Sequence, residues 1–154
     1  MKKFLFDCGT RDSVASAGLL FLRLGFGLMM AIGHGWPKVV AFEKLKDDWA
    51  VPAVWPLSYM SSPVSLIATI GAELGCAALL VLGLATRPAA FILGFAMVVA
   101  AFQVLGDNPL FLPAQGAKEP ALLYLFACVA LIVAGAGKAS LDARVYKEKR
   151  RKFF

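Results

Sequence analysis

The chain has 154 residues, of which 60% are hydrophobic and only 17% are charged, and its net charge is +6 at pH 7. A soluble domain is about 45–50% apolar and about 25% charged. The mean hydropathy of +0.73 therefore argues against a soluble enzyme and for an integral membrane protein. The length accommodates a single membrane domain, residues 1–154.

Four apolar blocks in the sequence predict four membrane-spanning helices. A bilayer core of about 30 Å is crossed by about 17–25 helical residues. Three of the blocks begin at a proline, which loses no hydrogen bond in the first turn of a helix. The predicted fold is an all-α, four-helix membrane bundle, with spans at about residues 14–34, 63–84, 88–105 and 120–136.

The charges outside these blocks predict the orientation. Eleven lysines and arginines lie on the side of the two termini, in the N-terminal segment, at Arg87 and in the tail 138–154, and four lie on the other side. The positive-inside rule then places both termini in the cytoplasm and the loop 35–62 outside. We expect a multi-pass protein of a bacterial-type cytoplasmic (inner) membrane, anchored by an uncleaved first span.

Two ionisable residues lie inside predicted spans, and both are costly there. Counted along helices at 1.5 Å per residue, Arg23 lies about 14 Å and Glu73 about 17 Å from the cytoplasmic edge. The two side chains are therefore expected to meet if the first two spans are neighbours. Two interpretations stay open: a structural ion pair that locks two helices, or the charged wall of a ligand or proton site.

A second polar group gathers towards the predicted outer face. It consists of His34, Lys38, Gln103 and Glu119. Histidine, with an unperturbed pKa of about 6.5, can relay protons or donate a hydrogen bond to a quinone carbonyl. The alternative is a headgroup-level histidine and a lysine that extends to the interface. The candidate ligand-binding or proton-relay residues are thus Arg23, His34, Lys38, Glu73, Gln103 and Glu119.

Several kinds of chemistry find no support in the sequence. Cys8, Cys76 and Cys128 form no CxxC pair, so a dithiol enzyme is not expected. A single histidine does not build an ordinary zinc or haem site, and we expect neither a metal nor a covalent cofactor. Next to a membrane, the basic tail 144–152 favours contact with anionic lipid, and no nucleic-acid partner is expected.

Three sequence stretches resemble the DoxX family of small four-span membrane proteins: LRLGFGLMMAIGHGWPK, GAELGCAALLVLGLATRPAA and KEPALLYLFACVALIVAGAGKASLD. The resemblance implies a four-helix bundle and a role in membrane-associated oxidoreductase systems, because relatives include a subunit of thiosulfate:quinone oxidoreductase and components of thiol-redox complexes. The matching positions are Arg23, His34, Gly35, Lys38, Glu73, Gly83, Arg87, Glu119, Gly137, Ser140 and Asp142.

Two functional hypotheses follow. In the first, the chain is a subunit of a quinone- or thiol-linked oxidoreductase system, with a quinone-sized cavity whose charged floor is Arg23 and Glu73. In the second, it is a non-catalytic accessory or assembly subunit, in which the charged pair is only structural. Under both hypotheses, we expect the chain to contact the lipid bilayer and to associate with a membrane-protein partner or form a homo-oligomer.

Overall fold

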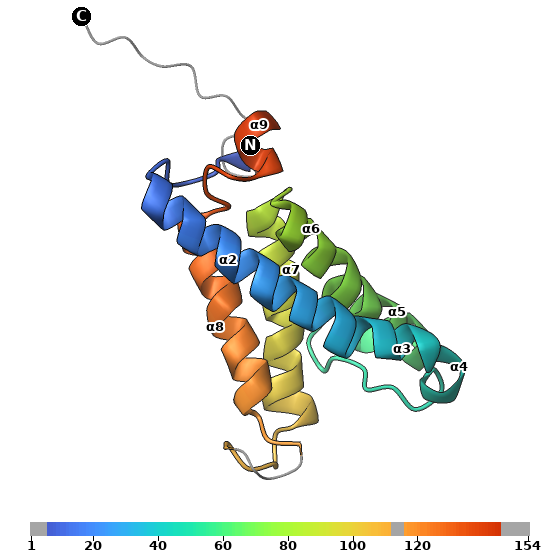
Figure 1. Cartoon of the computed structure of the whole chain (residues 1–154). Coiled ribbons are helices and arrows are strands. Elements are labelled where there is room, and N and C mark those ends of the chain that lie inside the picture. The colour runs from blue at the N-terminus through green and yellow to red at the C-terminus, as the bar shows by residue number, and fades with distance from the viewer. Residues whose placement is uncertain (1–5, 112–115, 146–154) are drawn as a thin grey trace, which may run out of the picture.

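The computed structural model describes residues 6–111 and 116–145, and within these ranges every regular element is helical. Figure 1 shows the arrangement. Three short π-helical segments, in which the turn is widened by one residue, interrupt the longer helices. The elements in chain order are α2 (Ser13–Met30), a π segment (Ala31–Gly35), α3 (Trp36–Val40), α4 (Phe42–Leu45), a 3₁₀ turn (Leu57–Tyr59), α5 (Ser62–Ile70), a π segment (Gly71–Cys76), α6 (Ala77–Leu82), α7 (Thr86–Val99), a π segment (Ala100–Val104), α8 (Glu119–Ala134) and α9 (Leu141–Val145).

The predicted helical membrane bundle is confirmed. Three continuous helices, Ser13–Val40, Ser62–Leu82 and Thr86–Val104, are long and apolar enough to cross a membrane. The helix α8 is apolar but shorter, with 16 residues, which corresponds to about 24 Å of helix. Asp12 begins the first helix, because its carboxylate accepts a hydrogen bond of 2.7 Å from the Ala15 N–H.

The first helix is longer than the sequence predicted. The external loop was expected to begin at residue 35, but helix continues through Gly35 and Pro37 to Val40. A proline inside a helix leaves a carbonyl without its donor and crowds the preceding turn. Here the preceding turn is a π segment, in which the Trp36 N–H bonds to the Ala31 carbonyl. The wider turn accommodates Pro37, so the HGWPK motif extends the span instead of ending it.

The helices pack as two pairs that share one core. The helix α7 packs along α8, and α2 packs along α6 (Figure 1). Small residues allow close approach, since a Cβ added to Gly27 would lie 2.7 Å from Val81, and one added to Gly94 would lie 3.2 Å from Cys128. The core between the pairs is apolar.

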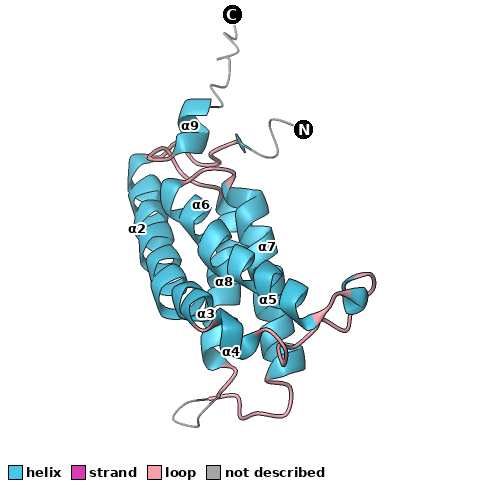
Figure 2. Ribbon diagram, turned by 90° about the vertical axis from the view of Figure 1, so that its right-hand side faces the viewer, coloured by secondary structure: helices cyan, strands magenta, loops and turns pink. Residues whose placement is uncertain are grey.

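The second and third spans diverge towards one end of the bundle. Within the second span, contacts to α7 come from α6 and from the π segment Gly71–Cys76, whereas α5 leans away from α7 (Figures 1 and 2). The loop 46–61 lies against this outer half. The divergence leaves space between helices, and the candidate site occupies it.

The described ends of the chain lie together at the opposite end of the bundle (Figures 1 and 2). There the Gly137 N–H donates a hydrogen bond of 2.8 Å to the Cys8 carbonyl. This arrangement fits the prediction that both termini lie on one side of the membrane.

Candidate functional site: a cavity beside a buried ion pair

Arg23 and Glu73 do not form the expected ion pair. Arg23 is fully buried and donates hydrogen bonds to backbone carbonyls, 3.1 Å to Leu80 and 2.7 Å to Ala139. Glu73 instead pairs with Lys38. Side chains on a helix lean towards its N-terminus. Because the first two spans run in opposite directions, Arg23 leans towards the terminal end of the bundle and Glu73 leans away from it.

Arg23 belongs to a network that holds the terminal end together. Its guanidinium donates hydrogen bonds to the carbonyls of Leu80 and Val81 in the last turn of α6, at 3.1 and 3.5 Å, and the Leu80 carbonyl also accepts from the Gly83 N–H. Gly83 ends that helix at a positive φ of 66° and leaves room for the guanidinium, since an added Cβ would lie 2.1 Å from Arg23 Nη1. Asp142 accepts hydrogen bonds from the N–H groups of Ala85 and Thr86, at 2.7 and 3.0 Å, and so caps α7. This network joins α2, α6, α7 and the segment after α8, and it does not line the cavity described below.

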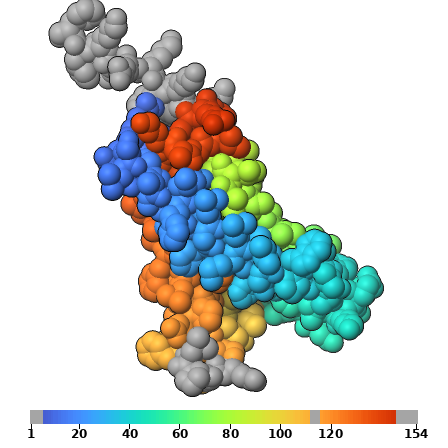
Figure 3. All heavy atoms as spheres, viewed as in Figure 1, coloured from blue at the N-terminus to red at the C-terminus, as the bar shows by residue number. Residues whose placement is uncertain are grey.

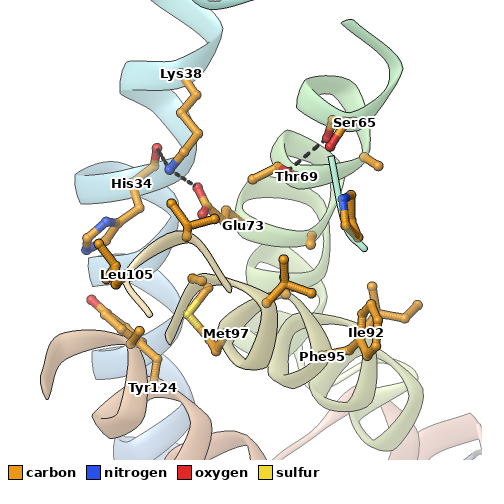
Figure 4. A pocket seen from close by; sticks show the side chains of 18 of the residues that line it. His34, Lys38, Ser65, Thr69, Glu73, Ile92, Phe95, Met97, Leu105 and Tyr124 are labelled. Carbon is orange, nitrogen blue, oxygen red and sulfur yellow. Dashed lines mark hydrogen bonds and ion pairs between the residues drawn. The ribbon is translucent and has the colours of Figure 1, made fainter. Parts of the chain in front are cut away.

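The ion pair between Lys38 and Glu73 joins the first two spans. Glu73 is buried, with 6% of its surface exposed, and its carboxylate accepts a hydrogen bond from Lys38 Nζ (Figure 4). Lys38 Nζ also donates to the His34 carbonyl at 3.3 Å and lies 5.6 Å from the centre of the Trp49 ring. The close approach requires Gly35, where an added Cβ would lie 2.9 Å from the Leu74 backbone nitrogen.

The ion pair borders a cavity of about 510 Å³, within the range of small-molecule sites. The ionisable lining groups Lys38, Glu73, His34 and Tyr124 lie towards one side, and Ser65, Thr69 and Ile92 lie towards the other (Figure 4). Ile92 is 50% exposed, and it stands where α5 and α7 diverge. The cavity therefore runs from the Lys38–Glu73 ion pair to an opening between two spans.

Tyr124 is a lining residue that sequence reasoning missed. It is buried on α8, and its ring stands edge-on to the His34 ring with centres 5.4 Å apart. The Phe26 ring also stands edge-on to the Tyr124 ring, with centres 5.6 Å apart. A tyrosine inside an otherwise apolar span was the available signal, because a buried phenol oxygen requires a polar neighbourhood.

The loop 46–61 covers part of the cavity and is fixed by side chains of the spans. The Trp49 indole N–H donates to Thr69 Oγ1 at 3.1 Å, and Ser65 Oγ donates to the Ala50 carbonyl at 2.6 Å. Gln103 binds the loop with both ends of its amide, accepting from the Ala53 N–H at 2.8 Å and donating to the Val51 carbonyl at 2.7 Å. These hydrogen bonds hold the loop in place over the cavity.

The polar group that the sequence predicts at the outer face is thus only partly brought together at the cavity. His34 and Lys38 line the cavity. The amide of Gln103 is engaged with the loop and does not line it, and the Glu119 side chain is also absent from the lining, although the neighbouring Pro120 contributes to it. His34, Glu73 and Gln103 each lie in one of the π segments, a local geometry often found at functional sites.

Comparison with known proteins identifies the family. The sequence profile of the DoxX family matches residues 18–106, which is more than half of the chain. The chain belongs to the DoxX family. As a member with membrane-spanning helices, it is a multi-pass membrane protein. The matched region contains Arg23, His34, Lys38, Glu73 and Gln103.

Two proteins of Haemophilus influenzae are similar to this DoxX-family chain. One is 33% identical over 132 residues, covering 84% of this chain and 92% of the relative. The other is 28% identical over 148 residues, covering 92% of this chain and 91% of the relative. Both are uncharacterized proteins. No solved structure matches the chain.

Proposed function

We propose that this DoxX-family protein is a redox-linked subunit of a bacterial-type cytoplasmic membrane and that its cavity binds a quinone. The observation that carries the proposal is the cavity of about 510 Å³ itself, which is apolar over most of its wall and holds the Lys38–Glu73 ion pair at its inner end. A quinone ring needs apolar walls and a few donors for its carbonyl oxygens.

The lining groups fit the chemistry of quinone reduction. Reduction to the quinol adds two electrons and two protons, so that each carbonyl oxygen becomes a hydroxyl. Lys38 Nζ and the Tyr124 hydroxyl are donors for the carbonyl oxygens, and Glu73 and His34 are groups that can pass protons. The electrons come from a partner oxidoreductase subunit, to which this chain supplies the quinone site.

The opening between α5 and α7 suits the long apolar tail of a membrane quinone. Ala68 on α5 and Ile92 on α7 line the cavity and are both exposed on the outside of the bundle. In a membrane protein that exposed surface meets lipid, so a tail can leave the cavity sideways without crossing a polar surface. The polar head and the tail then occupy the two ends of one cavity.

Trp49 provides a reporter of occupancy, because it lines the cavity and quinones quench tryptophan fluorescence at contact distance. Purified protein in detergent is titrated with a benzoquinone that carries a decyl chain. We expect saturable quenching that Trp49→Phe removes and that Glu73→Gln shifts to at least tenfold higher quinone concentration. Glu43→Gln, which changes an exposed acid outside the cavity, is the matched control and leaves the curve unchanged. Quenching that does not saturate, or that Glu73→Gln does not shift, contradicts the proposal.

A second candidate function is that of a non-catalytic accessory or assembly subunit. It is supported by the mutual pairing of Lys38 and Glu73, which locks two spans together without any ligand. In that role the protein co-purifies from native membranes with a larger complex at a fixed ratio. The double variant Lys38→Gln/Glu73→Gln then lowers recovery of that complex, whereas in the quinone-binding role it lowers turnover and leaves recovery intact.

A further inference from the structure

A second hollow lies at the terminal end of the bundle, far from the cavity. It is a groove of about 380 Å³ between the end of α6 and the segment that follows α8. Its charged lining residues are Lys138 and Arg144, both exposed, and among the residues that the structure describes its lining contains no carboxylate. The apolar lining residues are Val81, Leu82 and Leu141. The groove thus combines two cations with apolar side chains.

Two buried charges of opposite sign, Arg23 and Asp142, lie close to the groove. Arg23 lies under it and donates a hydrogen bond of 2.7 Å to the carbonyl of Ala139, a groove residue. Asp142 is close in sequence but is 1% exposed, and its two oxygens accept hydrogen bonds from backbone N–H groups at the start of α7. The charges of Arg23 and Asp142 therefore offset each other, and the net positive charge at the groove comes from Lys138 and Arg144.

The cations are carried by a segment that is fixed to two spans. The Lys138 N–H donates to Ser16 Oγ of α2 at 3.0 Å, and the Asp142 N–H donates to the Gly83 carbonyl at the end of α6 at 2.8 Å. Ser140 Oγ donates to the Gly137 carbonyl at 2.6 Å within the segment. Figure 3 shows the segment, in red, filling the space between the start of α2 and the end of α6. This fixed backbone holds both cations beside the ends of the spans.

The place of the groove along the membrane normal selects its ligand. The span Ser62–Leu82 ends at Leu82, whose side chain is 54% exposed, so the groove lies where the apolar surface gives way to the polar headgroup region. It is also at the end that the charge bias predicts to be cytoplasmic, and basic pockets between spans on that side bind anionic headgroups. We infer that this groove binds the phosphate of an anionic phospholipid, with the first carbons of the lipid against Leu82 and Leu141.

The full-length protein is tested in nanodiscs of phosphatidylcholine that contain a minor fraction of phosphatidylglycerol. Protein is extracted in mild detergent, and native mass spectrometry measures the phosphatidylglycerol that it retains. We expect the wild type to retain this lipid in preference to phosphatidylcholine, and Lys138→Gln/Arg144→Gln to lower the retained amount at least fivefold. Arg11→Gln/Lys44→Gln removes the same charge from exposed positions outside the groove and keeps the wild-type retention.

Three results decide the inference. Both double variants change exposed side chains, and equal unfolding temperatures establish that their folds are intact. Equal retention of phosphatidylglycerol by the groove variant and the control overturns the inference, as does equal retention of the two lipids by the wild type. Displacement of the retained lipid by millimolar inorganic phosphate assigns the groove to a soluble anion instead of a lipid.

Discussion

Arg23 and Lys38 are both basic and both lie on the first span, yet the groups that balance their charges differ. Arg23 is fully buried and donates to backbone carbonyls at the terminal end. Lys38 is paired with the carboxylate of Glu73 on the wall of a cavity. A charge that is satisfied by the backbone holds the fold, whereas a charge that is paired beside an open volume can exchange its partner for a ligand. The comparison therefore separates the end of the bundle where a buried charge holds the helices together from the end that contains the proposed quinone cavity.

The largest effect is expected from Arg23→Met. The substitution removes the side-chain donor of the Ala139 carbonyl and one of the two donors of the Leu80 carbonyl. Hydrogen bonds to a charged group contribute about 1.5–3 kcal/mol each, so we expect the free energy of unfolding to fall by about 3 kcal/mol or more. Thermal unfolding in detergent measures this loss. Quinone affinity of the protein that remains folded is expected to be unchanged, and a selective loss of affinity with normal stability would reverse the two roles.

A smaller loss of stability is expected from Gly83→Ala at the same end. The new Cβ would lie 2.1 Å from Arg23 Nη1, and the residue would have to keep a φ of 66°. Such a conformation costs a non-glycine residue about 1–3 kcal/mol. Gly25→Ala is the matched control on α2, because nothing lies within 4 Å of its added Cβ. Equal unfolding temperatures of the two variants would contradict the claim that the Arg23 guanidinium requires a glycine at position 83.

At the other end, Gly35→Ala is expected to cost about 1 kcal/mol and to weaken quinone binding. Its Cβ would lie 2.9 Å from the Leu74 nitrogen, so the first two spans must separate, and overpacking of this kind costs about 1–3 kcal/mol, less the gain in helix propensity. Separation of the spans also pulls Lys38 from Glu73. Gly33→Ala lies in the same π segment with open space around its Cβ and serves as the control. Equal affinities of the two variants in the Trp49 quenching assay would contradict this reading.

Much of the fold could be predicted because it depends on composition and hydropathy. The apolar blocks and the prolines at their starts mark the helices, as the observed bounds Ser62–Leu82 and Thr86–Val104 show. The end of the first helix was not predictable in this way. Pro37 is a normal sign of a helix end, and only the π segment before it allows the helix to continue.

The residues of the candidate site were predicted better than their pairing. His34, Lys38 and Glu73 were all singled out, but Glu73 was assigned to Arg23 on the basis of depth alone. Depth counts place Cα atoms, whereas side chains on antiparallel spans lean in opposite directions. The partners of Arg23 are backbone carbonyls, which every residue has, so no residue type in the sequence marks them.

The different roles of the two ends are tested most directly by measuring the unfolding temperature with and without quinone. The three proteins compared are the wild type, Lys38→Gln/Glu73→Gln and Gly83→Ala. At a quinone concentration of about 100 times the dissociation constant, binding stabilises the folded state by about 2.7 kcal/mol, so we expect the wild type to shift upward by about 5–10 °C.

In the same measurement, Lys38→Gln/Glu73→Gln removes both partners of the buried pair, which is often nearly neutral for stability. This variant is therefore expected to unfold close to the wild-type temperature without quinone and to lose the upward shift. Gly83→Ala is expected to unfold at a lower temperature and to keep the shift. A full quinone shift in Lys38→Gln/Glu73→Gln, or its loss in Gly83→Ala, would contradict the assignment of quinone binding to the end that holds Lys38 and Glu73.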